Sequence, residues 1–239
     1  MSRIGDVGCM SNHCSSIIIL NHPTYVPKHW HGTLLIWAVL SICLVFNTFF
    51  SRKLPLVEGI IVVLHVVGFF AVIVPLWVMG DRTTSDHVFT QFQDNMNWGS
   101  VPLAVIIGLT GAASTFIGCE SGVHMAEEVQ NAAYVVPRAM LWSWLGNGFM
   151  GWIMAITFCF CVKDTTSILT TPTKVPAIQV FLNTTGSTAG ASGLTAIMLV
   201  IGVFACVAVM ATNSRQLFAF SRDHGVPFSS FFCKVGKAC

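Results

Sequence analysis

Five long stretches without Asp, Glu, Lys or Arg alternate with short polar links along the chain. They cover residues 32–50, 59–79, 101–119, 139–162 and 191–214. Each is long enough to cross the hydrocarbon core of a bilayer, which takes roughly 20 residues of α-helix. Because backbone N–H and C=O groups find no water inside lipid, these stretches are expected to be helices. The pattern predicts an all-α, polytopic membrane protein.

The composition supports a membrane protein and argues against a soluble domain. Charged residues make up 9% of the 239 residues and hydrophobic residues 54%, whereas an ordinary soluble domain has about 25% charged residues. Residues 1–15 form a divergent N-terminal segment without the apolar run of a signal peptide, and 233–239 form a short tail. Residues 16–232 hold the membrane domain, with spans predicted at about 32–50, 57–79, 101–123, 139–162 and 191–214.

The nine cysteines do not form a recognisable metal site. No Cys-x-x-Cys pair and no zinc-like Cys/His spacing occurs, so a metal or disulfide framework is the less favoured alternative, and neither a metal nor a cofactor is expected. Cysteines in or at the end of apolar spans are expected to act as small hydrophobic residues: Cys43, Cys119, Cys159, Cys161 and Cys206. No basic patch with interleaved aromatic residues is present, which argues against nucleic-acid binding.

The placement of Lys and Arg predicts an orientation, because short cytoplasmic loops collect these residues. One set of alternate links holds Arg52, Lys53, Arg138, Arg215, Arg222, Lys234 and Lys237, and the other holds Lys28, Arg82, Lys163 and Lys174. The larger set is expected in the cytoplasm, together with the C-terminus. The N-glycosylation sequon at Asn183 would then lie outside, although such a three-residue pattern also occurs by chance.

Three ionisable residues fall at membrane depth, where such groups are costly and often functional. Glu58 is expected at the membrane interface and His65 as a hydrogen-bonded packing residue. Glu120 is different, because Gly118 and Gly122 flank it together with Cys119 and Ser121. The two glycines permit a break in the helix that would expose backbone groups to a substrate. Simple helix packing through Gly-x-x-x-Gly is the equally weighted alternative.

Nothing in the sequence indicates an enzyme. The run from Gly118 to Gly122 is not a nucleophile elbow, because Cys119 and Val123 occupy the positions that need glycine. A catalytic triad, a metal cluster and a phosphate-binding loop are also absent from the sequence. Transport across the membrane is therefore favoured over catalysis.

Several motifs resemble the amino acid–polyamine–organocation superfamily, in particular its fungal amino acid/choline permease branch, which includes GABA and choline permeases. The strongest is Phe116-Ile117-Gly118-Cys119-Glu120, followed by residues 124–128, 131–133 and 136–140. Further matches lie at residues 30–35, 46–49, 54–59, 171–187 and 214–223. They occur in order from about residue 17 to 232.

The resemblance implies a leucine-transporter-like fold of two inverted five-helix repeats, of which this chain resembles helices four to eight. In the family, broken helices one and six cradle the substrate, and only the sixth is present here. The resemblance places six residues in the substrate site: Phe116, Ile117, Gly118, Cys119, Glu120 and Ser121. It assigns structural roles to Gly122, Glu127, Glu128, Arg138, Arg215 and Arg222.

The expected function is secondary active transport of amino acids or related amines such as GABA, coupled to protons, in the fungal plasma membrane. The partners would be a small amine or amino acid, protons and the lipid bilayer. A choline or polyamine permease is one alternative, with Phe116 and Trp152 as candidate cation–π partners. The other alternative is a truncated membrane fragment that does not transport.

Overall fold

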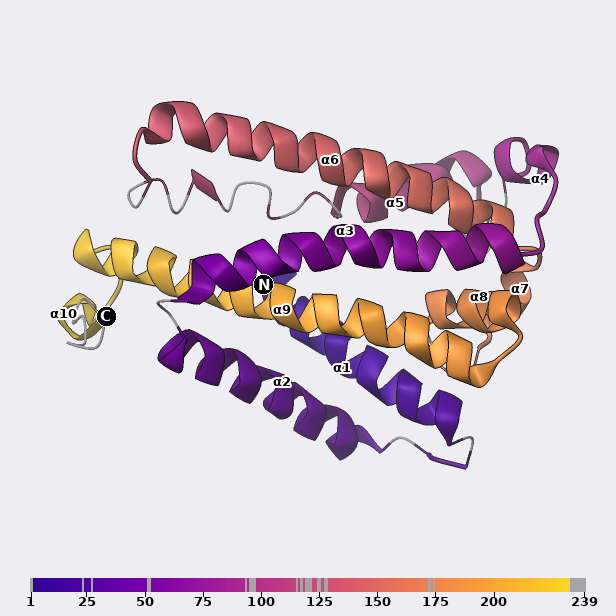
Figure 1. The fold of residues 1–239 in the computed structure, drawn as a ribbon, viewed down its shortest axis with the longest axis horizontal. Helices are drawn as coiled ribbons and strands as arrows, with labels where there is room; N and C mark the ends of the chain where they lie inside the picture. Colours follow the sequence, from indigo (N-terminus) through magenta and orange to yellow (C-terminus); the bar gives the residue numbers. More distant parts are fainter. Residues whose placement is uncertain are drawn as a thin grey trace. The chain divides into compact units, whose positions relative to one another are not determined.

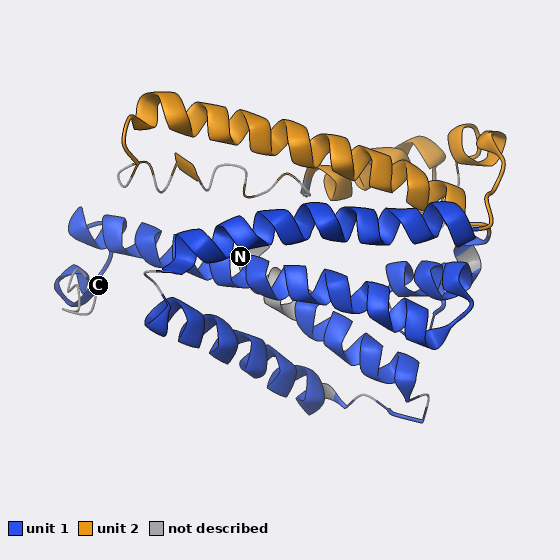
Figure 2. Ribbon diagram, viewed as in Figure 1, with its two compact units in different colours: residues 1–80, 164–239 blue, residues 81–163 orange. Residues whose placement is uncertain are grey.

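The computed structural model describes residues 2–22, 24–26, 28–50, 53–92, 94, 98–114, 116, 118, 122–123, 126, 129–171, 173 and 175–232. Every regular element within these residues is a helix, as the apolar pattern predicted. The chain divides into two compact units (Figure 2): residues 1–80 with 164–239 form unit 1, and residues 81–163 form unit 2. Each unit is described separately below.

Unit 1 is built around one long helix, α9 (Thr188–Arg222). Five helices of the unit contact it, as Figure 1 shows: α1 (Ser2–Asn21), α2 (His29–Phe49), α3 (Leu54–Met79), α8 (Pro176–Thr185) and α10 (Ser229–Phe232). The short helix α7 (Thr165–Leu169) packs against α8. A buried cluster joins α2, the start of α3 and α9 through Val39, Cys43, Leu54, Cys206, Val207 and Ala211.

Small residues bring the helices of unit 1 close together. A Cβ atom added to Gly68 of α3 would lie 2.8 Å from Cδ1 of Ile201 on α9. At Gly202 of α9 the neighbour is Met10 of α1, whose sulfur would lie 2.2 Å from an added Cβ. Because lipid gives no hydrophobic drive for helix association, such close contacts are the main source of packing energy in a bilayer.

Polar side chains add specific hydrogen bonds between these elements. The Asn47 amide on α2 donates to the carbonyl oxygen of Val207 on α9, at 3.1 Å. The buried Ser16 hydroxyl on α1 donates to the carbonyl oxygen of Thr173, at 2.7 Å. In the same helix, the Ser11 hydroxyl donates to the carbonyl oxygen of Gly32, at 3.0 Å. Helix α1 (Ser2–Asn21) thus covers the described part of the segment 1–15, which the sequence set apart, and continues beyond it.

Unit 2 contains α4 (Ser85–Phe89), α5 (Val101–Ser114) and α6 (Ala132–Cys161). Its two ends are held together by an ion pair between Lys163 Nζ and Asp81 Oδ2 at 2.8 Å. Nearby, the Thr83 N–H donates to the carbonyl oxygen of Phe160, at 2.9 Å. The hydrogen bond from Lys163 lowers the pKa of the exposed Asp81 carboxyl. This pair is therefore retained above the ordinary pKa of an aspartate and weakens as strong acid protonates the carboxylate.

Four described helices are long and apolar enough to cross a membrane, not five. They are the apolar part of α2 (Trp30–Phe49), α3, α6 and α9. The third predicted span, residues 101–123, begins with α5, which has 14 residues and ends at Ser114. Gly118, four residues further on, has a φ of +103°, which a right-handed α-helix cannot contain. The protein is nonetheless an all-α, integral membrane protein.

Candidate functional site

The candidate site lies in unit 2, where α5 stops and the chain turns toward α6. After Ser114 the Phe116 N–H donates to the carbonyl oxygen of Ala113, at 3.2 Å, in a turn. Gly118 then adopts a positive φ, and Gly122 and Val123 form a short 3₁₀ turn. The described residues of this segment therefore do not continue the α-helix.

The segment follows one face of α6. The Phe116 ring lies against Trp144, with ring centroids 5.6 Å apart. It also touches Gly148, where an added Cβ would lie 3.3 Å from Cε1 of the phenylalanine. At the other end, an added Cβ on Gly122 would lie 3.7 Å from Cγ of Met140. Because Met140, Trp144 and Gly148 are spaced four apart, they form a single stripe on α6.

Trp144 is the aromatic neighbour that sequence reasoning missed. Phe116 and Trp152 were the predicted cation–π partners of a choline or polyamine cargo, and Trp152 lies two turns beyond Trp144, about 12 Å along the helix axis. The ring that contacts Phe116 is that of Trp144. Gly148 leaves room for the Phe116 ring on this face of α6, because it has no side chain.

Six of the predicted residues lie outside the described residues: Ile117, Cys119, Glu120, Ser121, Glu127 and Glu128. Phe116, Gly118 and Gly122 are described, and the structure brings Phe116 and Gly122 to the same face of α6. The site assignment for all nine residues stays a prediction.

The remaining predicted residues have clear surroundings. The Arg138 guanidinium on α6 lies 4.0 Å from the centre of the Tyr134 ring, in a cation–π contact one helical turn away. Arg215 and Arg222 lie on the last turns of α9, and Arg222 Nε is 3.5 Å from the Asp223 carboxylate. Asn183 is exposed on α8, and its side-chain oxygen accepts a hydrogen bond from Gln179 Nε2 at 2.8 Å.

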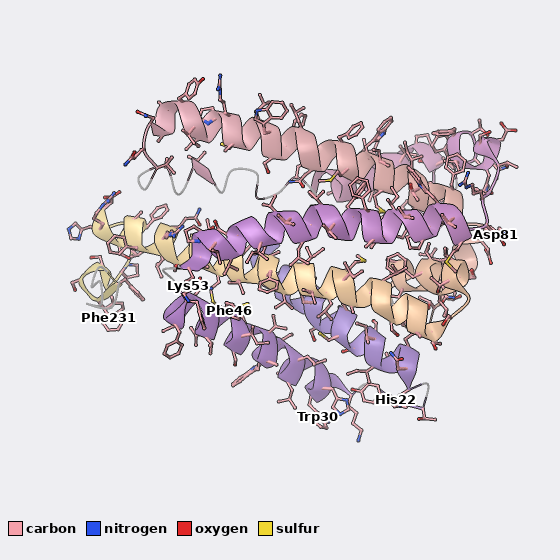
Figure 3. The ribbon with its side chains drawn as sticks, in the orientation of Figure 1. His22, Trp30, Phe46, Lys53, Asp81 and Phe231 are labelled. Carbon is pink, nitrogen blue, oxygen red and sulfur yellow. The ribbon has the colours of Figure 1, made fainter. Side chains whose placement is uncertain are left out.

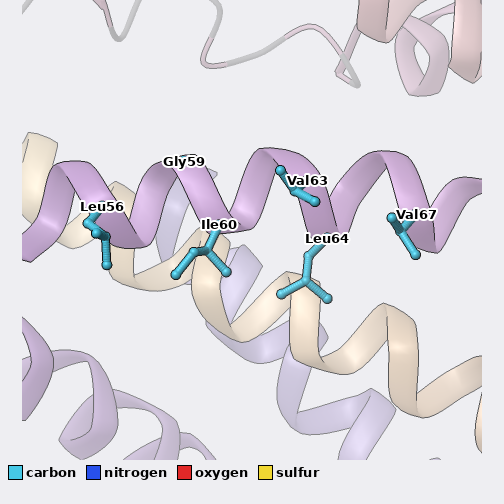
Figure 4. Close-up of a pocket in the computed structure, with 6 residues that line it drawn as sticks. All are labelled: Leu56, Gly59, Ile60, Val63, Leu64 and Val67. Atoms are coloured by element: carbon cyan, nitrogen blue, oxygen red, sulfur yellow. The ribbon is translucent and has the colours of Figure 1, made fainter.

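A second hollow lies on α3 and has a different character. It is lined by Leu56, Gly59, Ile60, Val63, Leu64 and Val67, and Figure 4 shows them along one face of the helix. None of these side chains can form a hydrogen bond or carry a charge. This groove suits lipid chains or another apolar helix, and it offers nothing to orient a polar solute.

The part of the chain that the structure describes contains no group of three His, Cys, Asp or Glu side chains able to hold a metal ion. The free cysteines described there are Cys14, Cys43, Cys159, Cys161 and Cys206.

Comparison with known proteins identifies the family. The model of the amino acid permease family matches residues 7–238, nearly the whole chain. The chain belongs to the amino acid permease family. The match begins within the segment 1–15 that the sequence set apart from it. No solved structure gives a significant match.

Related proteins come from fungi and are named as transporters. A provisionally named amino acid/polyamine transporter of Macrophomina phaseolina is 30% identical over 218 residues, which cover 90% of this chain and 48% of the relative. The choline transporter of Saccharomyces cerevisiae is 25% identical, over 90% of this chain and 38% of its own length. Amino-acid permease 2 of Neurospora crassa is 26% identical, over 93% of this chain and 41% of its own length. The chain thus spans less than half the length of these relatives.

Proposed function

We propose that this chain is part of a secondary active transporter for amino acids or related amines such as GABA, with choline or a polyamine as the alternative cargo. Membership of the permease family and the names of its relatives support this proposal. The proposal includes coupling to protons, a plasma-membrane location, a cytoplasmic C-terminus and no covalent chemistry. The Lys and Arg asymmetry of the links supports the orientation.

The observation that carries the proposal is the end of α5 at Ser114 within an otherwise apolar stretch. Beyond it, Gly118 has a φ of +103° and the described residues form only turns. A broken helix at membrane depth leaves N–H and C=O groups without helical partners. Such groups are tolerated only where protein or a polar cavity satisfies them. Secondary transporters use this arrangement to bind polar substrates near the bilayer midplane.

Within this site we assign each residue a role. Gly118, Cys119, Glu120 and Ser121 line it, together with backbone groups of Phe116 and Ile117. The Glu120 carboxylate attracts a cationic or zwitterionic amine, or it carries the coupling proton. Phe116, placed against Trp144, provides an aromatic face beside the break. Aromatic faces attract quaternary and primary ammonium groups through their quadrupole.

The proposed site has two parts, and this chain supplies one of them. The relatives are more than twice as long as the segment they share with this chain. A transporter site at the interface of two repeats needs discontinuous helices from both. The opposing half must come from helices outside these 239 residues. A membrane fragment that does not transport is the alternative for the chain on its own.

A chimera tests the proposed function. Residues 16–232 would replace the aligned region of the S. cerevisiae choline transporter, and radiolabelled choline, GABA and amino acids would be offered to a choline-uptake-deficient strain. Saturable uptake of at least one of these solutes is expected, and its dependence on an inward proton gradient tests the coupling. A chimera that reaches the cell surface and takes up none of these solutes would refute the proposed function.

A further inference from the structure

The last turns of α9 extend beyond the membrane. The helix has 35 residues, which corresponds to about 52 Å, whereas the hydrocarbon core is about 30 Å thick. Its charge-free part ends at Ser214, and Arg215 and Arg222 follow. Residues 215–222 therefore continue α9 into the headgroup region and beyond it.

The chain then reverses direction. His224 and Phe228 both have a positive φ, of 56° and 61°, and the Gly225 N–H donates to the carbonyl oxygen of Phe220, at 2.8 Å. These turns return α10 to the side of α9, and the two helices are in contact (Figure 1). Figure 3 shows Phe231 of α10 at the same end of unit 1 as Lys53, the residue before α3.

This reversed segment exposes an unusual number of aromatic rings. Phe228 is 80% exposed, Phe231 70% and Phe220 63%, and Phe232 and Leu217 are also exposed. Exposed residues on membrane-spanning helices face lipid or other helices, but these rings lie past the end of the apolar part of α9. Phenylalanine and leucine at this level suit the boundary between headgroups and acyl chains.

The segment and the residues after it carry a net positive charge. Residues 215–232 contain Arg215 and Arg222 against Asp223, a net charge of +1 with neutral histidine, and Lys234 and Lys237 bring residues 214–239 to +3. Of the two arginines, Arg222 lies 3.5 Å from the Asp223 carboxylate. Basic residues beside a membrane are attracted to anionic lipids. Aromatic rings, positive charge and direct continuity with a membrane-spanning helix occur together here.

We propose that the segment from Arg215 to Phe232, here called the α9–α10 reversal, is an interfacial anchor that binds the anionic lipid surface. The exposed rings insert at the headgroup boundary, and the basic side chains contact lipid phosphates and carboxylates. The anchor fixes the end of α9 relative to the bilayer. It does not depend on which solute the permease carries.

Hydrogen–deuterium exchange of the full 239-residue chain in lipid nanodiscs tests this directly. Backbone exchange of residues 223–232 would be compared in phosphatidylcholine alone and in phosphatidylcholine mixed with phosphatidylserine. Slower exchange is expected with phosphatidylserine, and high salt should remove the difference. Because both leaflets contain the anionic lipid, the result is independent of the orientation of the protein.

Two double variants separate the contributions. In Arg215→Gln/Arg222→Gln, the protection by phosphatidylserine should fall about fivefold for each arginine that touches the surface, the factor that corresponds to roughly 1 kcal/mol. In Phe231→Ser/Phe232→Ser, exchange should become fast in both lipids. Phe92→Ser, which removes an exposed ring from unit 2, should leave the exchange of residues 223–232 unchanged in both lipids. For every variant, unchanged exchange in α2 indicates an intact fold.

Equal exchange of residues 223–232 of the unmodified chain in the two lipids would overturn the proposal. Protection that is strong but insensitive to lipid charge and to salt would also overturn it, and would indicate that protein covers the rings instead.

Discussion

Gly118 is the residue on which the break after α5 most directly depends. Its φ of +103° lies in a region that side-chain-bearing residues rarely adopt, and open space surrounds the position of an added Cβ. The strain of a substitution there comes from the backbone and not from a steric clash. Its backbone conformation therefore separates Gly118 from Gly108 and Gly111, which lie within α5.

We predict that Gly118→Ala lowers the free energy of unfolding by about 1–3 kcal/mol, the usual cost of an unfavourable backbone conformation. Gly108→Ala is the matched control, since it lies inside α5 and also has open space around it. Alanine is favoured over glycine in a helix by about 1 kcal/mol, so this control should be neutral or stabilising. Denaturation of the purified variants in detergent measures both free energies of unfolding. Equal changes in Gly118→Ala and Gly108→Ala would contradict the role assigned to Gly118.

Glu120 is the residue that we propose connects the break to transport. A carboxylate moved from water into a low dielectric costs several kcal/mol unless it is paired or protonated. In the chimera, Glu120→Gln keeps the shape and removes the charge, and we predict lower uptake or an altered pH dependence at unchanged surface expression. Glu58→Gln, a partly exposed carboxylate near the start of α3, is the control. If uptake and its pH profile are the same in Glu120→Gln and the parent, the carboxylate is dispensable.

At the residue scale, the sequence identified glycines at which the backbone could leave the helical conformation. It did not predict which side chains of two separate segments come into contact. The Gly118 and Gly122 pair stood out from its spacing alone. The contact between Phe116 and Trp144 did not, because it depends on which face of α6 the non-helical segment follows. Because α6 has apolar residues on every side, its sequence does not indicate which face contacts the non-helical segment.

At the scale of elements, the pairing of α3 with α9 depends on close approach at Gly68. We predict that Gly68→Val destabilises unit 1 by about 1–3 kcal/mol, as expected for overpacking, because Ile201 occupies the space. Gly59→Val lies on the same helix with nothing nearby and should change stability by less than about 0.5 kcal/mol. Thermal unfolding in the same detergent compares the two, and similar losses would show that α3 and α9 do not pack at Gly68.

The boundaries of the elements were predicted unevenly. Helices α2, α3, α6 and α9 each contain a predicted apolar span. They also extend past it, since a helix does not stop where charges begin; α9 continues eight residues beyond Ser214. Within the third predicted span α5 ends at Ser114, and hydropathy gives no sign of this end because it reports burial in lipid and not backbone dihedrals. The helical state of residues 2–15 gave no apolar signal, and its stability comes from tertiary contacts with Gly32 and Gly202.

At the scale of the whole molecule, orientation follows from charge. We predict that the end of α9 is cytoplasmic and that α8 is external. Cysteine introduced at exposed Arg222 or Asn183 would be labelled with a membrane-impermeant reagent in intact cells, against the unmodified chain as background. Labelling at 183, and at 222 only after permeabilisation, is expected. Labelling at 222 but not at 183 in intact cells would reverse the orientation.

The family was predictable from the sequence because its motifs are short, ordered and spread over most of the chain. The division into two units was not, because it depends on contacts between segments far apart in sequence. The inverted-repeat relationship stays a prediction, since it concerns helices beyond this chain as well as those within it.

The central claim is that this chain supplies one of the two parts of a transport site. One measurement tests it most directly: uptake of radiolabelled choline, GABA and amino acids into liposomes, with the purified 239-residue chain and the purified chimera side by side. The chain alone should insert but show no saturable uptake, because the opposing broken helix is missing, whereas the chimera should take up at least one solute. Saturable uptake by the chain alone, or none by a correctly inserted chimera, would contradict the account.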